Sequence, residues 1–305
     1  MAKIPGLVLW NATRDKGNAR YLTEDAYALH DEGEIILAMP EDISYGIDDG
    51  EAWFEVHGVR YSTSDPDNLP PYCMIRVSPR GITKHIEEMG IPCFPSSNMS
   101  AFGKDKKRVY ARAIQMGIPC PKSIFTLSPK KEELPSLPIM LKPNSGHSGD
   151  GVRKIRTEEE LEEALETCSN RTFDPIWQEC MPTGDDLRIY MLGRDRIYGA
   201  VMRTATADKA NLAFNPIFEG LTTEELKEKF PEAFELALKF GSSFDENTGL
   251  IALDFLFDAD RHPVLGELNS ALPLTFPAWR EKHPNAVKTY IDYLNEKCGV
   301  NSDMR

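Results

Sequence analysis

The feature that most constrains the fold is an alternation of short apolar segments with helix-like segments through about the first hundred residues. Apolar runs at 4–10, 34–39 and 72–77 have the length of strands, and helical patterns occupy 20–31 and 81–90. Strands that alternate with helices form a parallel sheet, because a helix is the usual crossover between parallel strands. The sequence therefore predicts a small, mostly parallel α/β domain and places the chain in the α/β class.

The remaining elements are expected in a less regular order. Around His57 and Gly58 the pattern predicts a hairpin, and 91–94 predicts one more short strand of the first domain. The chain has 305 residues, which at roughly 150 residues per domain predicts two lobes, or a lobe and a lid. Further helices are expected over 104–117, 157–168, 222–240 and 284–297, and further strands over 122–126, 138–143, 187–192, 196–203, 249–257 and 263–268.

Composition excludes several classes of protein. An apolar fraction of 41% and a charged fraction of 27% exclude a disordered chain, a collagen-like repeat and a coiled coil. No apolar run approaches the ~18 residues that cross a bilayer, and the N-terminus lacks a cationic segment leading into an apolar one. We therefore expect a cytoplasmic protein with no membrane partner.

The charge balance restricts the partners. Lys and Arg total 35 against 48 Asp and Glu, a net charge of −13, which repels polyanions and predicts no nucleic-acid partner. A small anion is compatible with this charge, since a few local cations and backbone amides can hold one. The six cysteines form no CxxC pair and are expected to be reduced packing residues.

A glycine-rich segment follows a predicted strand that ends in Lys142. Gly146, Gly149 and Gly151 allow successive backbone amides to turn inward around an anion, and the lysine adds a positive charge. The segment is neither a Walker loop nor a dinucleotide-binding fingerprint, because no GK[ST] ends it and the glycine order is G-x-x-G-x-G. A phosphate-binding loop and an ordinary surface turn both fit this pattern.

A set of oxygen ligands lies on two later predicted strands. Asp254 is on one strand, and Glu267 and Asn269 on the next share one face because they are two residues apart. Two carboxylates and an amide oxygen suit Mg²⁺. The alternative is a pair of solvated acidic positions, but Glu267 has apolar neighbours, among which an unpaired carboxylate is costly.

A third motif is Gln178-Glu179-Cys180 at the end of a short strand, followed by Asp186-Leu187-Arg188. Such a connection can offer backbone groups to a base edge and a carboxylate to ribose hydroxyls. An ordinary interdomain linker has a similar sequence pattern, so both interpretations fit.

The order of these three motifs resembles the ATP-grasp superfamily, specifically the RimK-like carboxylate–amine ligases. Asp105-Lys106 followed by Gly117–Pro121, and a hairpin followed by a strand ending in Arg76, match further family features. The resemblance covers almost the full length. It implies an ATP-grasp fold with an N-terminal parallel α/β (pre-ATP-grasp) domain, a small α+β lid and a C-terminal α+β domain, over 1–98, 99–177 and 178–305.

The resemblance also implies roles for individual residues. Lys106 and Lys142 match the lysines that reach the ATP phosphates, Asp186 the ribose-binding acid, and Arg203 the arginine near the γ-phosphate. The residues implied to bind ATP are Lys106, Lys142, Ser145, Gly146, Gly149, Gly151, Gln178, Glu179, Cys180, Asp186 and Asn211. Those implied in catalysis are Lys142, Arg188 and Arg203, and those implied to hold Mg²⁺, or Mn²⁺ in its place, are Asp254, Glu267 and Asn269.

The activity implied by the resemblance is an acid–amino-acid ligase that forms an amide through an acyl phosphate. It would join an amino acid such as glutamate to a small molecule or peptide end, as a dimer or tetramer. A macrocyclase of ribosomal peptides and a non-catalytic nucleotide-binding module are the alternatives. After Asn269 the family usually continues x-S-P-G, whereas this chain reads Ser270-Ala271-Leu272-Pro273, which argues against a standard glutamate-ligase pocket.

Overall fold

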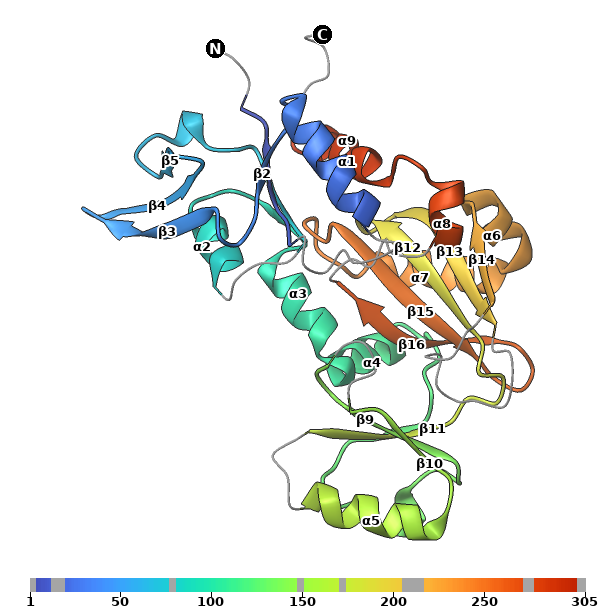
Figure 1. Ribbon diagram of the computed structural model, residues 1–305. Helices are drawn as coiled ribbons and strands as arrows, with labels where there is room; N and C mark the ends of the chain where they lie inside the picture. The colour runs from blue at the N-terminus through green and yellow to red at the C-terminus, as the bar shows by residue number, and fades with distance from the viewer. Residues whose placement is uncertain are drawn as a thin grey trace.

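The computed structural model describes residues 4–11, 20–76, 81–146, 151–169, 174–204, 217–270 and 277–300. Their strands form four sheets, arranged as an N-terminal part, a central part and a small lobe that projects away from both (Figure 1). Among the described residues no helix is both long and apolar enough to cross a membrane.

The N-terminal sheet is parallel, as the sequence predicts. Its strand order is β2-β1-β6-β7, and its strands are short and apolar because both faces are covered. Helix α1 connects β1 to β2, and α2 connects β6 to β7. The bounds are β1 Gly6–Leu9, α1 Arg20–Asp31, β2 Ile35–Ala38, β6 Cys73–Ile75, α2 Ile82–Glu88 and β7 Cys93–Phe94.

A three-stranded antiparallel sheet extends from the N-terminal part. It consists of β3 (Ile43–Asp48), β4 (Glu51–Val56) and β5 (Val59–Ser62), with a 3-10 turn η3 (Pro66–Asn68) after it. The predicted hairpin is β4–β5, and its two turn residues, at 57 and 58, both have positive φ, as a tight hairpin turn requires. Strand β3 was not predicted.

The small lobe (residues 123–179) is a four-stranded antiparallel sheet, β10-β9-β11-β8, covered by helix α5. Leu161, Ala164 and Cys168 of α5 pack against Leu141 and Trp177 of the sheet. The bounds are β8 Ser123–Ile124, η4 Lys131–Glu133, β9 Ile139–Pro143, β10 Arg153–Ile155, α5 Glu158–Ser169 and β11 Pro175–Glu179.

The central sheet has the order β14-β13-β12-β15-β16 and is antiparallel throughout. One face buries residues such as Leu187, Leu253 and Phe255 beneath helices that include α4 and α7 (Pro231–Gly241). Helices α3 and α4 contact β16. The bounds are α3 Ser97–Lys104, α4 Lys106–Gln115, β12 Asp186–Leu192, β13 Arg196–Thr204, β14 Ile217–Leu221, β15 Leu250–Phe257 and β16 Pro263–Asn269.

The single helix predicted over 222–240 is wrong. The segment forms two helices, α6 (Thr223–Lys229) and α7 (Pro231–Gly241), which meet at Phe230. Pro231 has no N–H to continue the first helix, and the residue before a proline avoids the helical region, so Phe230 has φ −135° and ψ 56°. Two short helices, α3 and α8 (Pro277–Lys282), were also not predicted.

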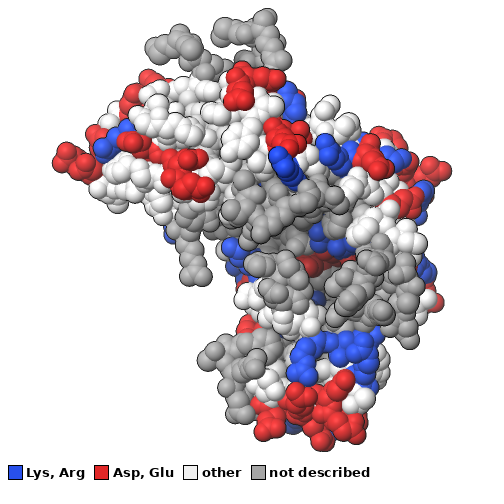
Figure 2. Space-filling view, viewed as in Figure 1, with Lys and Arg blue, Asp and Glu red and all other residues white. Residues whose placement is uncertain are grey.

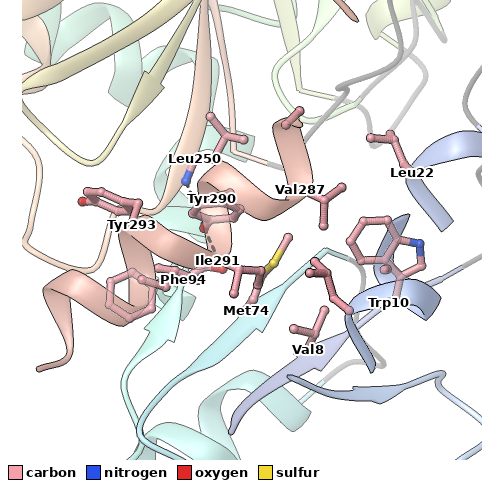
Figure 3. Close-up of a cluster of buried hydrophobic side chains, with 14 of the residues drawn as sticks. Val8, Trp10, Leu22, Met74, Phe94, Leu250, Val287, Tyr290, Ile291 and Tyr293 are labelled. Carbon is pink, nitrogen blue, oxygen red and sulfur yellow. Dashed lines mark hydrogen bonds between the residues drawn. The ribbon is translucent and has the colours of Figure 1, made fainter. Parts of the chain in front are cut away.

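The other face of the central sheet packs against the N-terminal part and the last helix, α9 (Ala286–Lys297). Val287, Tyr290 and Ile291 of α9 lie between the parallel sheet and the central sheet (Figure 3). The backbone N–H of Leu250 donates to the Tyr290 hydroxyl over 3.0 Å. This shared core holds the parallel sheet and the central sheet together.

Candidate active site

Two arginine–aspartate pairs lie side by side on the face of the central sheet that turns towards the N-terminal part. Arg188 on β12 is directly opposite Asp254 on β15, and its Nε and a terminal nitrogen each donate to that carboxylate over 2.6 Å. Asp186 is opposite Arg203 on β13 and accepts two hydrogen bonds from it. Arg203 also lies 3.3 Å from Asp254, so the four residues form one ion-pair cluster.

The ion-pair cluster is buried, each member being no more than 9% exposed. Burial raises the pKa of Asp186 to about 7, against the lowering effect of Arg203. Burial also acts to raise the pKa of Asp254, but the charges of Arg188 and Arg203 outweigh it and the pKa lies below the usual value. Asp254 is therefore the carboxylate that the two arginines keep ionised.

The predicted metal ligands adjoin this cluster. Glu267 on β16 is directly opposite Asp254, and Asn269 donates its side-chain N–H to Asp254 over 3.2 Å. The Glu267 carboxylate is one-third exposed and lies 3.3 Å from the ammonium of Lys106. Within the described part of the chain, no group of three or more His, Cys, Asp or Glu side chains is placed to hold a metal ion. Asp254, Glu267 and Asn269 lie close together on two paired strands, and their role as metal ligands stays a prediction.

A second network surrounds the hydroxyl of Tyr110 on α4. It donates to the backbone oxygen of Gly266 over 2.6 Å and accepts from Lys142 over 2.7 Å and from Gln178 over 3.2 Å. Gln178 also donates to Ser123 over 2.8 Å. Because Gly266 precedes Glu267, this hydroxyl connects the small lobe to the strand that carries the predicted metal ligands.

The segment after β9 is tied to the start of α4. Lys106 donates from its ammonium to the backbone oxygen of Gly146 over 3.2 Å. Asn144 accepts from the N–H of Lys107 over 3.0 Å and donates to Asp105, the N-cap of α4, over 3.1 Å. These contacts place the beginning of the glycine-rich segment beside Lys106.

The glycine-rich segment itself is described only in part. Ser145 is exposed, and Gly151 has a φ of +75°, a conformation that favours glycine. The predicted site residues Gly149 and Asn211 lie outside the described residues.

The predicted hinge lies at the end of β11. The Glu179 carboxylate accepts from the N–H of Lys122 over 2.6 Å, and the Glu179 N–H donates to the Lys122 oxygen over 2.9 Å. Gln178 is 2% exposed and Cys180 is half-buried. The ribose contact predicted for Asp186 stays a prediction, and in the structure both oxygens of that residue accept from Arg203.

Most of the predicted residues come together in two adjoining groups, with charged side chains of both signs in a recess next to the small lobe (Figure 2). Tyr110 was not predicted, because a tyrosine on an amphipathic helix has the pattern of a packing residue. Cys120 lies near Lys142, and burial raises the pKa of its thiol to about 12, so it is protonated at neutral pH.

Comparisons with known proteins concern the fold. No family model matches the sequence, and no curated protein matches it. The ATP-grasp ligase PsnB, solved with its minimal precursor, superposes with a TM-score of 0.67 at 15% identity, over 96% of this chain and 99% of that one. The chain has the ATP-grasp fold.

Two further ATP-grasp structures also superpose on nearly the whole chain. D-alanyl-alanine synthetase A from Vibrio cholerae has a TM-score of 0.69 at 14% identity, over 99% of this chain and 100% of that one. The macrocyclase MdnC from Microcystis aeruginosa, bound with precursor peptide MdnA, has a TM-score of 0.61 at 14% identity. The superposition covers 94% of this chain and 99% of MdnC. The ATP-grasp architecture expected from the sequence is confirmed, and the RimK-like subtype stays a prediction.

Proposed function

We propose that the protein is an ATP- and Mg²⁺-dependent ligase that joins a carboxylate to an amine through an acyl phosphate. The observation that carries the proposal is the buried ion-pair cluster, placed next to Glu267, Asn269 and Lys106 on a fold shared with ligases. Buried, strongly interacting cations and carboxylates with shifted pKa values are typical of functional sites.

ATP binding is assigned to the recess between the small lobe and the central sheet. Lys106 and Lys142, on α4 and β9, supply the positive charge for the phosphates. Gln178, Glu179 and Cys180 offer backbone groups to the adenine. A structure of PsnB with Mg and ADP, and one of a D-alanine–D-alanine ligase from Bacillus anthracis with ATP, support a nucleotide site on this fold.

The residues present fit Mg²⁺. Asp254, Glu267 and Asn269 are hard oxygen ligands on directly adjacent strands, and Glu267 is accessible enough to take part. A bound Mg²⁺ would neutralise phosphate charge during transfer. Because Asp254 already accepts from Arg188 and Arg203, we assign the larger share of the metal contact to Glu267 and Asn269.

The reaction divides into two transfers. An oxygen of the substrate carboxylate attacks the γ-phosphorus of ATP, ADP leaves, and Arg203 and Lys142 offset the negative charge that accumulates. The amine then attacks the acyl carbon, and phosphate leaves. Asp186 holds the guanidinium of Arg203 in one plane through two hydrogen bonds, so the arginine is oriented before substrate arrives.

The substrate pair is proposed at the level of chemical class. An amino acid such as glutamate joined to a small molecule or a peptide end is the first candidate, in line with the D-alanine ligases of the same fold. Modification of a precursor peptide is the second, because PsnB and MdnC, solved with precursor peptides, share the fold with TM-scores of 0.67 and 0.61. We expect a cytoplasmic dimer or tetramer.

The test is ADP release from ATP and MgCl₂ with a panel of amino acids, amines and peptides. The expected result is release that requires both an acid and an amine, and that falls by orders of magnitude in Glu267→Gln while the folded structure is kept. ATP binding with no ADP release across the panel would instead identify a non-catalytic module. Wild-type turnover in Glu267→Gln, or in excess chelator, would contradict the metal assignment.

A further inference from the structure

The strand order of the parallel sheet reverses between β1 and β6. The strand that follows β1 in the sequence, β2, pairs with the outer side of β1. The strand that follows β6, β7, pairs with the outer side of β6, in the opposite direction along the sheet. Open α/β sheets commonly bind ligands outside the carboxyl ends of two strands whose outgoing connections leave in opposite directions. The carboxyl ends of β1 and β6 are therefore a binding position that the ion-pair cluster does not include.

An arginine occupies this position. Arg76 directly follows β6, and its backbone N–H donates to the oxygen of Leu9 at the end of β1 over 2.9 Å. Its guanidinium lies 4.6 Å from the ring centre of Trp10, which directly follows β1. Trp10 is fully buried, and its Nε1 donates to Thr23 over 3.1 Å. The ring thus gives the guanidinium a fixed aromatic face to lie over, and Arg76 is 4% exposed.

The same end of the parallel sheet meets the face of the central sheet that carries the ion-pair cluster. Trp10 belongs to one apolar cluster with Tyr190 and Ala252 (Figure 3 shows part of this cluster). Tyr190 follows Arg188 by two residues on β12, and Ala252 precedes Asp254 by two on β15, so each shares a face with its charged neighbour. Arg76 therefore lies on the side of the molecule towards which the reacting groups turn.

We propose that Arg76 binds a side-chain carboxylate of the substrate, which is not the carboxylate that is phosphorylated. The inference rests on the proposed function and narrows its substrate to an amino acid or peptide with an additional carboxylate. A guanidinium, whose N–H groups form a rigid planar fork, can pair with both oxygens of a carboxylate while its carbon lies over an indole ring. In a chain of net charge −13, a buried cation also gives an acidic substrate one local point of attraction.

The experiment measures equilibrium binding of matched acid and amide pairs by calorimetry, in the presence of ADP and MgCl₂. The pairs are L-glutamate with L-glutamine and L-aspartate with L-asparagine. The variants are Arg76→Gln, which removes the charge, and Arg76→Lys, which keeps the charge and much of the side-chain volume if the first does not fold. The control is Arg60→Gln, because Arg60 also stacks on a tryptophan of the N-terminal part, Trp53, over 4.3 Å, but on the hairpin sheet.

We expect the wild type and Arg60→Gln to prefer the acid in at least one pair by about ten- to hundredfold. Arg76→Gln should lose that preference, and Arg76→Lys should reduce it, because an ammonium cannot make the paired contact. ATP affinity should be unchanged in all three variants. No acid preference in the wild type, or the same preference in both Arg76 variants, would overturn the inference.

ADP release, measured separately, distinguishes this inference from the proposed function. Release without any acid preference supports ligase activity and overturns the role of Arg76. An acid preference that Arg76→Gln abolishes, in a protein that releases no ADP, supports the role of Arg76 and counts against the ligase.

Discussion

Replacing Tyr110 with phenylalanine removes one hydroxyl from the contact between the small lobe and the central sheet. The backbone oxygen of Gly266 then loses its donor while it stays buried, a change that costs about 1–3 kcal/mol. Lys142 is half-buried and can turn to water, and Gln178 keeps its hydrogen bond to Ser123, so the loss of their bonds to Tyr110 adds little to this cost. We therefore expect Tyr110→Phe to lower the free energy of unfolding by about 1–3 kcal/mol.

The measurement is urea denaturation, with the slope of the transition compared between variants. An unchanged slope with a lower midpoint would show a loss of stability without a change in the surface that unfolding exposes. The control is Tyr27→Phe, because Tyr27 is 46% exposed and its loss should change the free energy by less than about 0.5 kcal/mol. Equal midpoints for Tyr110→Phe and the wild type would refute the reasoning.

The same substitution separates two roles of Lys142. In the structure the ammonium of Lys142 donates to Tyr110, so ATP must compete for it. Tyr110→Phe should therefore bind ATP at least as tightly as the wild type, although it is less stable. Weaker ATP binding would show instead that the hydroxyl positions Lys142 for the phosphates.

Three more predictions concern Lys142, Asp186 and His283, a half-buried residue just after α8 whose ring stacks on Trp279. Lys142→Ala should weaken ATP binding about ten- to hundredfold in calorimetry, and Lys142→Arg should restore little of it, since a broad guanidinium replaces a compact ammonium; unchanged affinity would remove Lys142 from the site. Asp186→Asn should lower the free energy of unfolding by about 1–3 kcal/mol, because buried Arg203 would lose the charge of the carboxylate that accepts two of its hydrogen bonds and keep only its contact with Asp254; a midpoint equal to that of the wild type would contradict this. Burial lowers the pKa of His283, so the unfolded chain binds more protons below about pH 6.5 and stability should fall as pH falls through that value. His283→Gln should flatten this part of the pH profile in thermal unfolding, and an equal slope would exclude His283 as its source.

The strands and helices of the parallel sheet were predictable because local patterns determine them. Segments such as β1 and β6 are apolar throughout, which is the signature of strands covered on both faces. Strand β3 escaped prediction because its residues are mostly exposed and include Ser44, Gly46 and Asp48, which have the composition of a turn. Its pairing with β4 depends on tertiary structure that a local pattern does not contain.

The site was predictable in its residue types and not in its pairings. Asp254, Glu267 and Asn269 stood out because polar residues interrupt apolar strands. That Arg188 pairs with Asp254, and Arg203 with Asp186, depends on the antiparallel register of three strands. A register is set by turns and by packing of the whole sheet, so the sequence shows which charges are present but not which of them neutralise one another.

The position of α9 between the two sheets has a consequence for how the chain is assembled. Strands β1 and β6 come early in the sequence, yet part of their apolar cover is supplied by Val287 and Ile291, which come near its end. The N-terminal strands and the central sheet should therefore gain and lose structure as one cooperative unit. The small lobe has its own apolar cluster and should open independently. In hydrogen exchange, amides of β1 and β15 should share one opening energy, while those of β9 exchange through a separate and lower one.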